Sequence, residues 1–409
     1  MARRIAVVGA GYAGMAAAVT LVDRGAQVVV FESGPVPGGR ARRVESRGES
    51  LDNGQHILIG AYATLFGLMR TVGVPTDAVL RMPLELRYAD GFSLRRLYLP
   101  APFGLLGGLL LARRLPWSDK LGAMRFMLAL RRTGFRLAED CSVSALLDRF
   151  GQSGRIGHYL WKPLCVSALN TLPDAASANV FLAVLRDGLA GDAEASDLIL
   201  PRVDLSRLFP EPAAAWLRSR DAEVRCGATV RDLAALRSEY GAVILAVGPH
   251  QLRPLLPEQA REFEYQPITT CYLQYDVRTR LPLPMLGLAG GLVQWVFDRG
   301  RLTGENGRLA AVISAQGDHQ QMTQEELART CHQELAAALP GLPEPQWTRV
   351  ISEKRATIAV PPGLQRPAVE TPLPGVFLAG DYTDPEYPPT LEAAARSGVR
   401  AAGLALDFR

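Results

Sequence analysis

The first hydrophobic pattern in the chain predicts a strand, a turn, a helix and a second strand. Ile5–Val8 is a short apolar run, residues 9–14 read GAGYAG, and Met15–Leu21 is an alanine-rich stretch of helical character. A second apolar run follows at Val28–Phe31. Two buried strands joined by a helix within about thirty residues form a parallel βαβ unit, because parallel strands require a crossover connection.

The rest of the chain carries further elements, which predict that one domain is inserted into another. The apolar patterns predict helical residues 119–150, a helix at Ala213–Leu217, strands at Ala222–Cys226, Val243–Gly248, Thr270–Val277 and Gly291–Phe297, a helix at Gln324–Leu339, a strand at Val376–Asp381 and a helix at Thr390–Leu406. Elements of the α/β type therefore return in the middle and at the end of the chain. We expect both chain ends to belong to one domain, with a second domain between them.

The three glycines of residues 9–14 have the spacing of a dinucleotide-binding turn. Gly9 makes the tight turn, Gly11 lets a pyrophosphate approach the backbone, and Gly14 lets the helix pack close to the strand. The phosphate then lies at the helix N-terminus, where free N–H groups and the helix dipole favour negative charge. Glu32 ends the second strand 18 residues after Gly14, where an acid binds a ribose hydroxyl. Such an acid disfavours a 2′-phosphate, so NADP is a poor fit.

Residues 97–112 form an uncharged stretch of sixteen residues between two arginine pairs, Arg95-Arg96 and Arg113-Arg114. Prolines and glycines interrupt this stretch, and it is shorter than the roughly 20 residues that span a bilayer. Its leucines and basic ends suit an element that dips into one leaflet and contacts anionic headgroups. A buried wall of the second domain explains the same composition equally well.

Length, charge and cysteine usage exclude several classes of protein. A chain of 409 residues is long enough for two or three domains, each with its own core. The formal net charge of +4 is far from the clustered basic face that binds nucleic acid, so we expect no nucleic-acid partner. The five cysteines are widely spaced and form no CxxC pair, which argues against a metal site or disulfides and for a reducing compartment.

Several separated motifs together resemble one superfamily, that of the FAD-dependent amine oxidases and phytoene desaturases. They are residues 9–14, Glu32 with Pro37–Arg40, Ala246–Gly248 and Leu378–Thr383. Within that superfamily, four segments are similar to the hydroxysqualene dehydroxylases of bacterial hopanoid pathways: Leu51–Tyr62, Trp161–Cys165, Ala168–Thr171 and Asp204–Pro210. The resemblance covers essentially the whole chain.

The resemblance implies an α/β protein with a Rossmann-like FAD-binding domain and an inserted α+β substrate-binding domain. The discontinuous FAD-binding domain is expected to comprise residues 1–75, 205–260 and 350–409. The substrate-binding domain is expected to comprise residues 76–204 and 261–349. Residues 97–112 are its candidate membrane-contacting segment.

FAD contacts are implied for ten residues: Gly9, Gly11, Gly14, Glu32, Gly39, Arg40, Val230, Gly380, Asp381 and Leu391. The first three glycines hold the pyrophosphate, and Glu32 binds the adenosine ribose. Arg40 contacts the phosphates or the flavin, and Asp381 binds the pyrophosphate or ribityl region. Backbone groups at Val230 meet the adenine, and the helix that begins near Leu391 stabilises negative charge on the reduced flavin. A surface arginine at position 40 and a turn cap at position 381 are the simpler alternatives.

The implied reaction is the reductive removal of the allylic hydroxyl group of hydroxysqualene, a C30 isoprenoid alcohol, to give squalene. Loss of water leaves an allylic cation, to which reduced flavin delivers a hydride. Hydroxide is a poor leaving group, so an acid must protonate the departing oxygen. Asp52, Gln55 and His56 are the leading catalytic candidates, because Leu51–Tyr62 runs along the flavin in the superfamily. A His56 that only hydrogen-bonds the cofactor or the backbone is an equally good interpretation.

Three further residues are candidate substrate ligands: Lys162, Asn170 and Arg355. Plain packing explains Lys162 and Asn170 more simply, whereas Arg355 resembles part of a strand that returns to the flavin. The expected partners are the C30 substrate, an unidentified electron donor and a membrane surface. Because such a substrate partitions into lipid, we expect a cytoplasmic protein at the inner face of the cytoplasmic membrane, without a metal.

Three other functions share this architecture. A carotenoid or phytoene-type desaturase transfers hydride from its substrate to oxidised FAD, and the sequence does not set the direction of electron flow. A flavin amine oxidase usually has an aromatic pair at the flavin, for which Tyr382 and Tyr387 are candidates, but the Leu51–Tyr62 segment argues against it. A non-catalytic prenyl-binding protein of the same fold lacks redox chemistry, and the intact Glu32 and Gly380-Asp381 argue against lost FAD binding.

Overall fold

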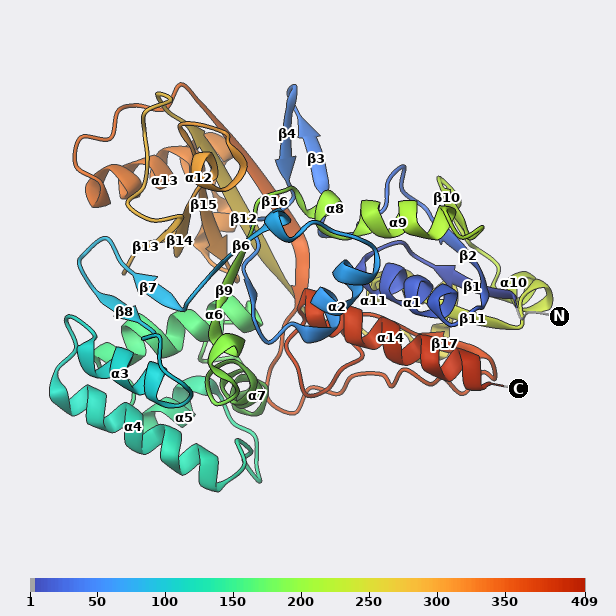
Figure 1. The fold of residues 1–409 in the computed structure, drawn as a ribbon, viewed down its shortest axis with the longest axis horizontal. Coiled ribbons are helices and arrows are strands. Elements are labelled where there is room, and N and C mark those ends of the chain that lie inside the picture. The colour runs from blue at the N-terminus through green and yellow to red at the C-terminus, as the bar shows by residue number, and fades with distance from the viewer. Residues whose placement is uncertain (1–3, 409) are drawn as a thin grey trace.

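Two five-stranded sheets, one parallel and one antiparallel, organise the computed structural model, which describes residues 4–408 (Figure 1). The parallel sheet lies at the right of the figure, near both ends of the chain. The antiparallel sheet lies at the upper left, and helices fill the lower left.

The parallel sheet joins three distant parts of the chain. Its strands, in spatial order, are β10 (Glu223–Cys226), β2 (Gln27–Glu32), β1 (Arg4–Val8), β11 (Ala242–Leu245) and β17 (Val376–Leu378). In the centre of the sheet, Val7 pairs with Val30 on one side and with Ile244 on the other. The strands are covered on both faces, which explains why they are continuous apolar runs rather than alternating ones.

Helices cover both faces of this sheet. One face packs against α1 (Tyr12–Asp23), α9 (Pro210–Arg218) and α14 (Leu391–Asp407), and the other packs against α10 (Leu233–Glu239) and α11 (Pro249–Leu252). Helix α14 packs closely on α1 because Gly398 has no side chain; a Cβ there would lie 2.1 Å from the carbonyl oxygen of Ala13. Beside these helices lie α2 (Ala63–Thr71) and α8 (Leu205–Leu208).

The antiparallel sheet has one face toward a helix and one toward the interior of the protein. Its order is β13 (Met285–Gly287), β14 (Trp295–Asp298), β15 (Arg308–Ser314), β12 (Tyr265–Gln274) and β16 (Trp347–Ile358). Side chains alternate between the two faces. Leu273 packs against α13 (Gln324–Ala338), whereas its neighbour Tyr272 joins Trp295 and Phe297 in a second core. A short helix, α12 (Arg299–Thr303), follows β14.

The second core also includes helices in the lower left part of Figure 1 and toward its centre. They are α3 (Phe103–Leu111), α4 (Trp117–Arg132), α5 (Val143–Arg149), the π-helix Gly157–Trp161, α6 (Lys162–Leu169) and α7 (Ala178–Leu189). The remaining strands form small sheets: β3 (Arg43–Ser46) with β4 (Glu49–Asp52), β5 (Leu58–Ile59) with β9 (Leu198–Pro201) and β6 (Val79–Met82), and β7 (Glu85–Arg87) with β8 (Ser93–Arg95). Single 3-10 turns occur at Thr76–Ala78, Ala193–Ser196, Pro257–Gln259 and Asp318–Gln321.

The predicted βαβ unit and the predicted α/β class are confirmed, but two predicted elements differ. Residues 119–150 are two helices rather than one, because α4 ends at Arg132 and Gly134 and Phe135 then adopt positive φ angles. The strand predicted from Gly291 begins only at Trp295. Before it, the backbone N–H groups of Leu292 and Val293 donate to the carboxylate of Glu334 instead of to a neighbouring strand.

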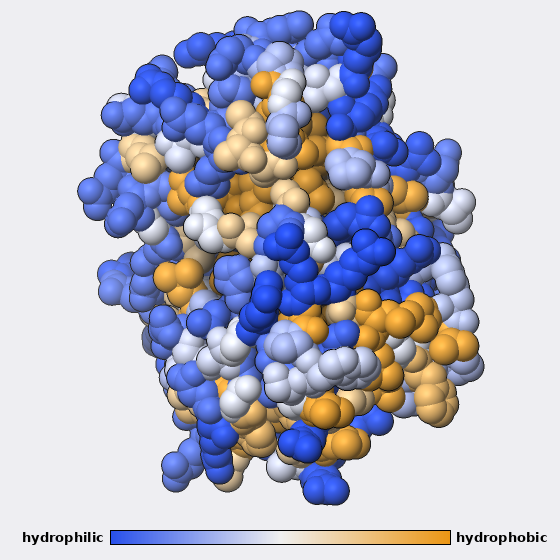
Figure 2. Space-filling model, turned by 90° about the vertical axis from the view of Figure 1, so that its left-hand side faces the viewer, coloured by the Kyte–Doolittle hydropathy of each residue, from blue (hydrophilic) through white to orange (hydrophobic). Residues whose placement is uncertain are grey.

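Residues 97–112 lie at the surface. Within them, the glycines of α3 pack against the backbone of the residues that precede the helix. Apolar side chains gather in the lower part of Figure 2, on the side of the molecule that carries α3 and α4 in Figure 1. Phe103 is 63% exposed and Leu111 is 69% exposed, whereas Leu105 and Leu109 pack against the second core, so a buried wall explains only part of this stretch. No helix within residues 4–408 is long and apolar enough to cross a membrane.

Candidate functional site

One cavity of about 1070 Å³ touches both sheets and the helices between them. It begins at the carboxyl ends of β1 and β2, where Gly9 and Glu32 lie on its wall, and this edge of a parallel sheet is where α/β proteins bind ligands. Its volume lies above the roughly 300–1,000 Å³ of a pocket for a single small molecule. A further part of its wall belongs to the second hydrophobic core and includes Leu84, Leu86, Leu160, Leu164, Val184, Met285, Trp295, Phe297 and Val312.

The turn between β1 and α1 can hold a pyrophosphate only because of its glycines. Gly9 has a φ of +105°, and a Cβ there would lie 2.5 Å from the carbonyl oxygen of Ala246. A Cβ at Gly14 would lie 1.8 Å from the carbonyl oxygen of Gly9, so α1 could not approach β1 as closely. Gly11 lies on the cavity wall and caps α1 without a side-chain hydrogen bond. The first N–H groups of α1 therefore remain available to an anion.

Glu32 is held at the end of β2 by two backbone hydrogen bonds. Its Oε2 accepts from the N–H of Ala10 at 2.8 Å, and its Oε1 accepts from the N–H of Gly34 at 2.7 Å. Each carboxylate oxygen has a second lone pair, so the group can still accept ribose hydroxyls. Val230 also lies on this part of the cavity wall, beyond β10.

Arg40 and Asp381 form an ion pair at the cavity wall. Nη2 of Arg40 donates to Oδ1 of Asp381 at 2.7 Å, and Nη1 donates to the carbonyl oxygen of Ala356 at 2.8 Å. These two hydrogen bonds of Arg40 connect the glycine turn at Gly39 to β16 and to the segment that follows β17. Arg40 is therefore not a free surface arginine, and Asp381 is only 5% exposed.

The N-terminus of α14 faces the same cavity through Leu391. Thr390 caps it by accepting from the N–H of Ala393 at 3.2 Å. The carboxylate of Glu392 accepts from the N–H groups of Thr64 and Leu65 and so binds α14 to the first turn of α2. The N–H groups at the start of α14 lie at the positive end of the helix dipole.

The three catalytic candidates occupy different environments. Gln55 and His56 lie on the cavity wall, whereas Asp52 does not. The Asp52 carboxylate is 1% exposed and points into the protein, where it accepts from the N–H of Leu205 at 2.8 Å and lies 3.5 Å from Arg299. Burial raises the pKa of Asp52 to about 6, although Arg299 and the Leu205 hydrogen bond act in the opposite direction. Asp52 therefore acts on the cavity only through its neighbours.

His56 is oriented by the backbone. Its Nδ1 lies 2.8 Å from the carbonyl oxygen of Gly54, which can only accept, so Nδ1 carries the proton in the neutral ring. Nε2 then carries the lone pair. Burial lowers the pKa of His56 below its ordinary value, and the charge of Arg40 lowers it further, against the Gly54 hydrogen bond. The neutral ring is therefore the main form at neutral pH.

Sequence reasoning missed Arg299, which contacts two of the three catalytic candidates, Asp52 and Gln55. This residue of α12 is 4% exposed, and its Nη1 donates to Oε1 of Gln55 at 3.0 Å. Its Nε donates to Glu305 at 2.8 Å. Because Oε1 of Gln55 accepts this bond, the amide nitrogen of Gln55 is the atom left for another partner. No local motif marks Arg299, since it lies 244 residues from Gln55.

Two of the three candidate substrate ligands, Asn170 and Arg355, lie on the cavity wall, and Lys162 does not. Lys162 is exposed and absent from the cavity wall, although its neighbours Pro163 and Leu164 are on it. Asn170 is buried at the end of α6, where its amide nitrogen contacts Thr357 at 3.0 Å and its oxygen accepts from the N–H of Ala315 at 2.7 Å. These contacts favour a structural role for Asn170. Arg355 is exposed and lies on the cavity wall.

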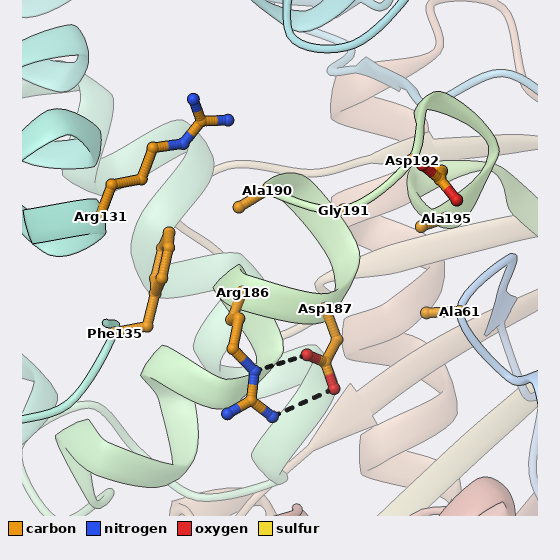
Figure 3. A pocket seen from close by; sticks show the side chains of 9 residues that line it. All are labelled: Ala61, Arg131, Phe135, Arg186, Asp187, Ala190, Gly191, Asp192 and Ala195. Carbon is orange, nitrogen blue, oxygen red and sulfur yellow. Dashed lines mark hydrogen bonds and ion pairs between the residues drawn. The ribbon is translucent and has the colours of Figure 1, made fainter. Parts of the chain in front are cut away.

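A second, more open pocket of about 590 Å³ shares Ala61 and Asp187 with the cavity (Figure 3). In it, Nε of Arg186 donates to Asp187 at 2.7 Å, and the hydroxyl of Tyr387 donates to the other carboxylate oxygen at 2.5 Å. Burial acts to raise the pKa of Asp187, but the bonds from Arg186 and Tyr387 outweigh it and hold the pKa below its usual range. Asp187 is therefore ionised at neutral pH and is not an acid there.

The residues on the cavity wall fit FAD. The glycine cradle leaves space that a Cβ would fill, the carboxylate of Glu32 lies on the wall at the end of β2, and a helix N-terminus stands at each of two points on the wall. The hydroxyl of Tyr382 is also buried on this wall and has no hydrogen-bond partner among the described residues. A buried polar group without a partner indicates a ligand group that completes the site.

Comparison with known proteins identifies relatives along the full chain. A family model described as flavin containing amine oxidoreductase matches residues 12–406. The chain is 30% identical over 443 residues to a hydroxysqualene dehydroxylase of Rhodopseudomonas palustris, covering 99% of each chain. Two further hydroxysqualene dehydroxylases match at 29% and 27% identity. A probable zeta-carotene desaturase of Synechococcus elongatus is 25% identical over 483 residues, covering 99% of this chain and 98% of the relative.

Solved structures show the same fold at lower identity. A single-substitution variant of putrescine oxidase superposes with a TM-score of 0.74 at 17% identity and covers 100% of each chain. The predicted arrangement of a parallel-sheet cofactor region joined to a mixed α and β region is thus confirmed as a known flavoenzyme fold.

Proposed function

Because the chain belongs to the flavin containing amine oxidoreductase family and, within it, to the hydroxysqualene dehydroxylases, we propose that it converts hydroxysqualene to squalene. The protein is an FAD-dependent oxidoreductase. In the proposed reaction the allylic alcohol takes up one proton and one hydride and releases water. The two electrons come from a cellular donor. The observation that carries the proposal is one cavity that joins the FAD cradle to an apolar chamber and has Gln55 and His56 on its wall.

Residues of the parallel-sheet region hold the cofactor in this proposal. The turn at Gly9, Gly11 and Gly14 binds the pyrophosphate, and Glu32 binds the adenosine ribose beside Val230. Gly39, Arg40, Gly380 and Asp381 bind the middle of the cofactor, and the α14 N-terminus at Leu391 faces the flavin. When bound, FAD supplies the hydride for the substrate carbon.

We assign the proton to Nε2 of His56. Nδ1 is committed to Gly54, so a proton taken up by the ring resides on Nε2, at the cavity wall. The lowered pKa makes the protonated ring a strong acid, which suits a poor leaving group such as hydroxide. Transfer of this proton to the hydroxyl oxygen lets the C–O bond break and water leave.

Gln55 binds the departing oxygen in this proposal. Its oxygen accepts from Arg299, so its amide nitrogen donates toward the cavity. Asp52 is a positioning residue, since its carboxylate balances the charge of Arg299, which holds Gln55. The apolar wall limits the access of water, which would otherwise add back to the allylic cation.

The remaining assignments follow from the same reaction. We propose that residues 1–75, 205–260 and 350–409 bind FAD and that residues 76–204 and 261–349 bind the substrate. Of the three candidate substrate ligands, Arg355 stays in the proposal because it lies on the cavity wall with an exposed side chain. Asn170 lies on the same wall, but its side chain is bonded to Thr357 and to the N–H of Ala315. The C30 substrate and product partition into lipid, so we propose that the enzyme works in the cytoplasm at the surface of the cytoplasmic membrane.

Anaerobic single turnover tests this function. The purified protein is reduced chemically and mixed with hydroxysqualene, and flavin absorbance and product mass are followed together. We expect the flavin to reoxidise while squalene forms. Flavin reduction when the oxidised protein meets a polyene precursor, without any reoxidation by hydroxysqualene, would show the alternative function, a carotenoid-type desaturase. A purified protein without yellow colour would instead favour a prenyl-binding protein.

A further inference from the structure

Exposed large apolar side chains are concentrated on α3, α4 and the loop before α3. Of the twelve such side chains in residues 4–408, eight lie between positions 98 and 128. These eight define the α3–α4 face: Tyr98, Leu99, Phe103, Leu110, Leu111, Trp117, Leu121 and Leu128. Monomeric soluble proteins rarely expose contiguous apolar patches of large size, so a partner for this face is expected.

Helix α4 has two apolar sides, and only one of them is needed for the core. Phe126 and Leu130 point into the second hydrophobic core and are each 1% exposed. Trp117, Leu121 and Leu128 follow a helical period on the opposite side and are 65%, 44% and 56% exposed. A helix with apolar residues on both sides is buried on both sides in its working state.

Helix α3 turns its glycines inward, packs Leu105 and Leu109 against the second core and leaves its other large side chains less covered. A Cβ at Gly104 would lie 2.7 Å from the carbonyl oxygen of Leu97, and a Cβ at Gly108 would lie 2.2 Å from that of Arg95. The helix thus packs directly on the backbone before it, which leaves Phe103, Leu110 and Leu111 exposed. The ammonium group of Lys120 donates to the carbonyl oxygen of Leu110 at 2.6 Å and joins α3 to α4.

The surroundings of this face are strongly basic. Residues 95–136 contain nine basic residues and one acidic residue, a net charge of +8, whereas the whole chain carries +4. The carboxylate of the acidic residue, Asp119, accepts a hydrogen bond from the backbone N–H of Ile156. Seven of the basic residues are exposed: Arg95, Arg113, Arg114, Arg125, Arg131, Arg132 and Arg136. The face therefore combines exposed apolar side chains with exposed arginines from the same segments.

We propose that the α3–α4 face docks onto a bilayer that contains anionic lipids. Apolar side chains enter the boundary between headgroups and acyl chains, the indole of Trp117 lies at the interface, and the arginines contact lipid phosphates. A second copy of the chain is a poorer occupant, because a symmetric dimer through this face would place two surfaces of +8 against each other.

The docking face is connected to the apolar part of the cavity by two backbone hydrogen bonds. Leu84 lies on the cavity wall, and its carbonyl oxygen accepts from the N–H of Arg96 at 2.8 Å. The next residue, Leu97, donates to the carbonyl oxygen of Gly104 in α3 at 3.0 Å. Docking therefore brings the apolar chamber close to the lipid from which an isoprenoid enters. This step rests on the proposed function, whereas docking itself does not.

Vesicle flotation with the FAD-loaded protein tests the docking face. The vesicles contain phosphatidylcholine alone or phosphatidylcholine mixed with phosphatidylglycerol, at low and high salt. We expect binding to the anionic vesicles, weakened by salt. The variant Phe103→Ser/Leu111→Ser should bind at least about tenfold more weakly, because each large side chain contributes strongly on burial. The control Val277→Ser/Met322→Ser alters two exposed apolar residues outside the face and should bind as the wild type does.

A charge variant and a fluorescence measurement locate the contact. Arg113→Glu/Arg125→Glu should lose the preference for anionic vesicles, whereas Arg329→Glu/Arg400→Glu, which changes exposed arginines elsewhere, should keep it. Brominated acyl chains should quench tryptophan fluorescence, and Trp117→Phe should remove most of this quenching. Equal quenching in Trp117→Phe and the wild type would overturn the proposal.

Two further outcomes overturn the docking proposal without bearing on catalysis. In one, the wild type floats with neither kind of vesicle. In the other, it is a dimer that Phe103→Ser/Leu111→Ser converts to a monomer, which makes the face an interface between copies. Turnover of detergent-dispersed hydroxysqualene separates the two proposals, since the docking variants should retain it. A protein that binds vesicles but turns over no hydroxysqualene keeps the docking face and loses the proposed function.

Discussion

Arg299 donates a 3.0 Å hydrogen bond to the carboxamide oxygen of Gln55, from a position 244 residues further along the chain. The guanidinium is almost fully buried, and Asp52 and Glu305 balance its charge. A buried charge with hydrogen-bonded partners is rigid, because any movement leaves a polar group unpaired. The amide of Gln55 is therefore locked with its nitrogen toward the cavity, as a donor on a largely apolar wall.

Replacing the amide nitrogen of Gln55 tests this donor. In Gln55→Glu the acceptor for Arg299 remains, but the N–H donor becomes a carboxylate oxygen. We expect kcat/KM for hydroxysqualene to fall about 10- to 100-fold, the range for a lost hydrogen bond to a charged or developing-charge group. Flavin content should not change.

Gln251→Glu is the matched control for this variant. Gln251 also lies on the cavity wall, and its Oε1 accepts from the N–H of Gly248 at 3.1 Å. It has no contact with Arg299 among those of the described residues. Equal losses of kcat/KM in the two variants would show that charge on the wall, rather than the donor at position 55, causes the effect.

The pH dependence of turnover tests His56. Burial lowers its pKa, so the protonated ring becomes scarce at a lower pH than it would for an ordinary histidine. If this ring is the acid, kcat/KM should decrease with rising pH, by up to tenfold per pH unit above the pKa. His56→Gln should lose this limb and about 100-fold or more in rate.

His250→Gln provides the comparison for His56. His250 lies on the same cavity wall, and burial lowers its pKa as well. We expect this variant to keep the pH profile of the wild type. A wild-type profile in His56→Gln would exclude His56 as the proton donor and leave it as a ring that only bonds to Gly54.

Local signals in the sequence were enough to predict the turn and strand end that form the proposed cofactor cradle, because these residues lie within one βαβ unit. Gly9, Gly14 and Glu32 have their roles within one βαβ unit, and the structure gives the spatial reason for each. Asp52 lies next to the same segment, but its side chain turns away from the cavity toward Arg299. The direction in which the Asp52 carboxylate points depends on Arg299 of α12, which is distant in the sequence. No local pattern carries that information.

The same dependence on distant segments explains why the roles of the candidate substrate ligands could not be predicted from the sequence. A polar residue in an apolar segment marks either a ligand or a buried structural bond. Asn170 ends α6 in a left-handed conformation and bonds to three other segments of the chain, whereas Lys162 reaches the solvent. The difference between the two depends on the strands β12, β15 and β16, which lie a hundred or more residues away for most of their length.

The burial of Asp52 predicts a pH effect on stability. The pKa of Asp52 is about 6 in the folded protein, compared with 3.8 for an ordinary aspartate. The folded state therefore binds a proton at Asp52 more tightly than the unfolded state does. A raised folded-state pKa means that protonation stabilises the fold as the pH decreases from about 6 to about 4. Relative to Asp52→Asn, the wild-type free energy of unfolding should gain up to about 1.4 kcal/mol per pH unit in this window.

Urea unfolding at several pH values measures this difference. Asp77→Asn serves as the control, since Asp77 is an exposed carboxylate in a surface turn. It should show the wild-type dependence on pH. A wild-type dependence in Asp52→Asn as well would mean that Arg299 holds the Asp52 carboxylate ionised throughout the window.

Two glycine substitutions distinguish an effect on the cofactor cradle from the general effect of replacing a helical glycine by alanine. In Gly14→Ala the new Cβ would lie 1.8 Å from the carbonyl oxygen of Gly9, a contact that forces α1 away from β1. The N–H groups that we propose to bind the pyrophosphate move with α1, so we expect the purified variant to lose most of its flavin. Gly403→Ala in α14 has no heavy atom within 4 Å of its new Cβ and should gain about 0.5–1 kcal/mol of stability from helix propensity. Flavin absorbance per protein and thermal unfolding measure both effects. Full flavin content in Gly14→Ala would show that the cradle tolerates the displacement and that the close approach of α1 to β1 is not needed to bind the cofactor.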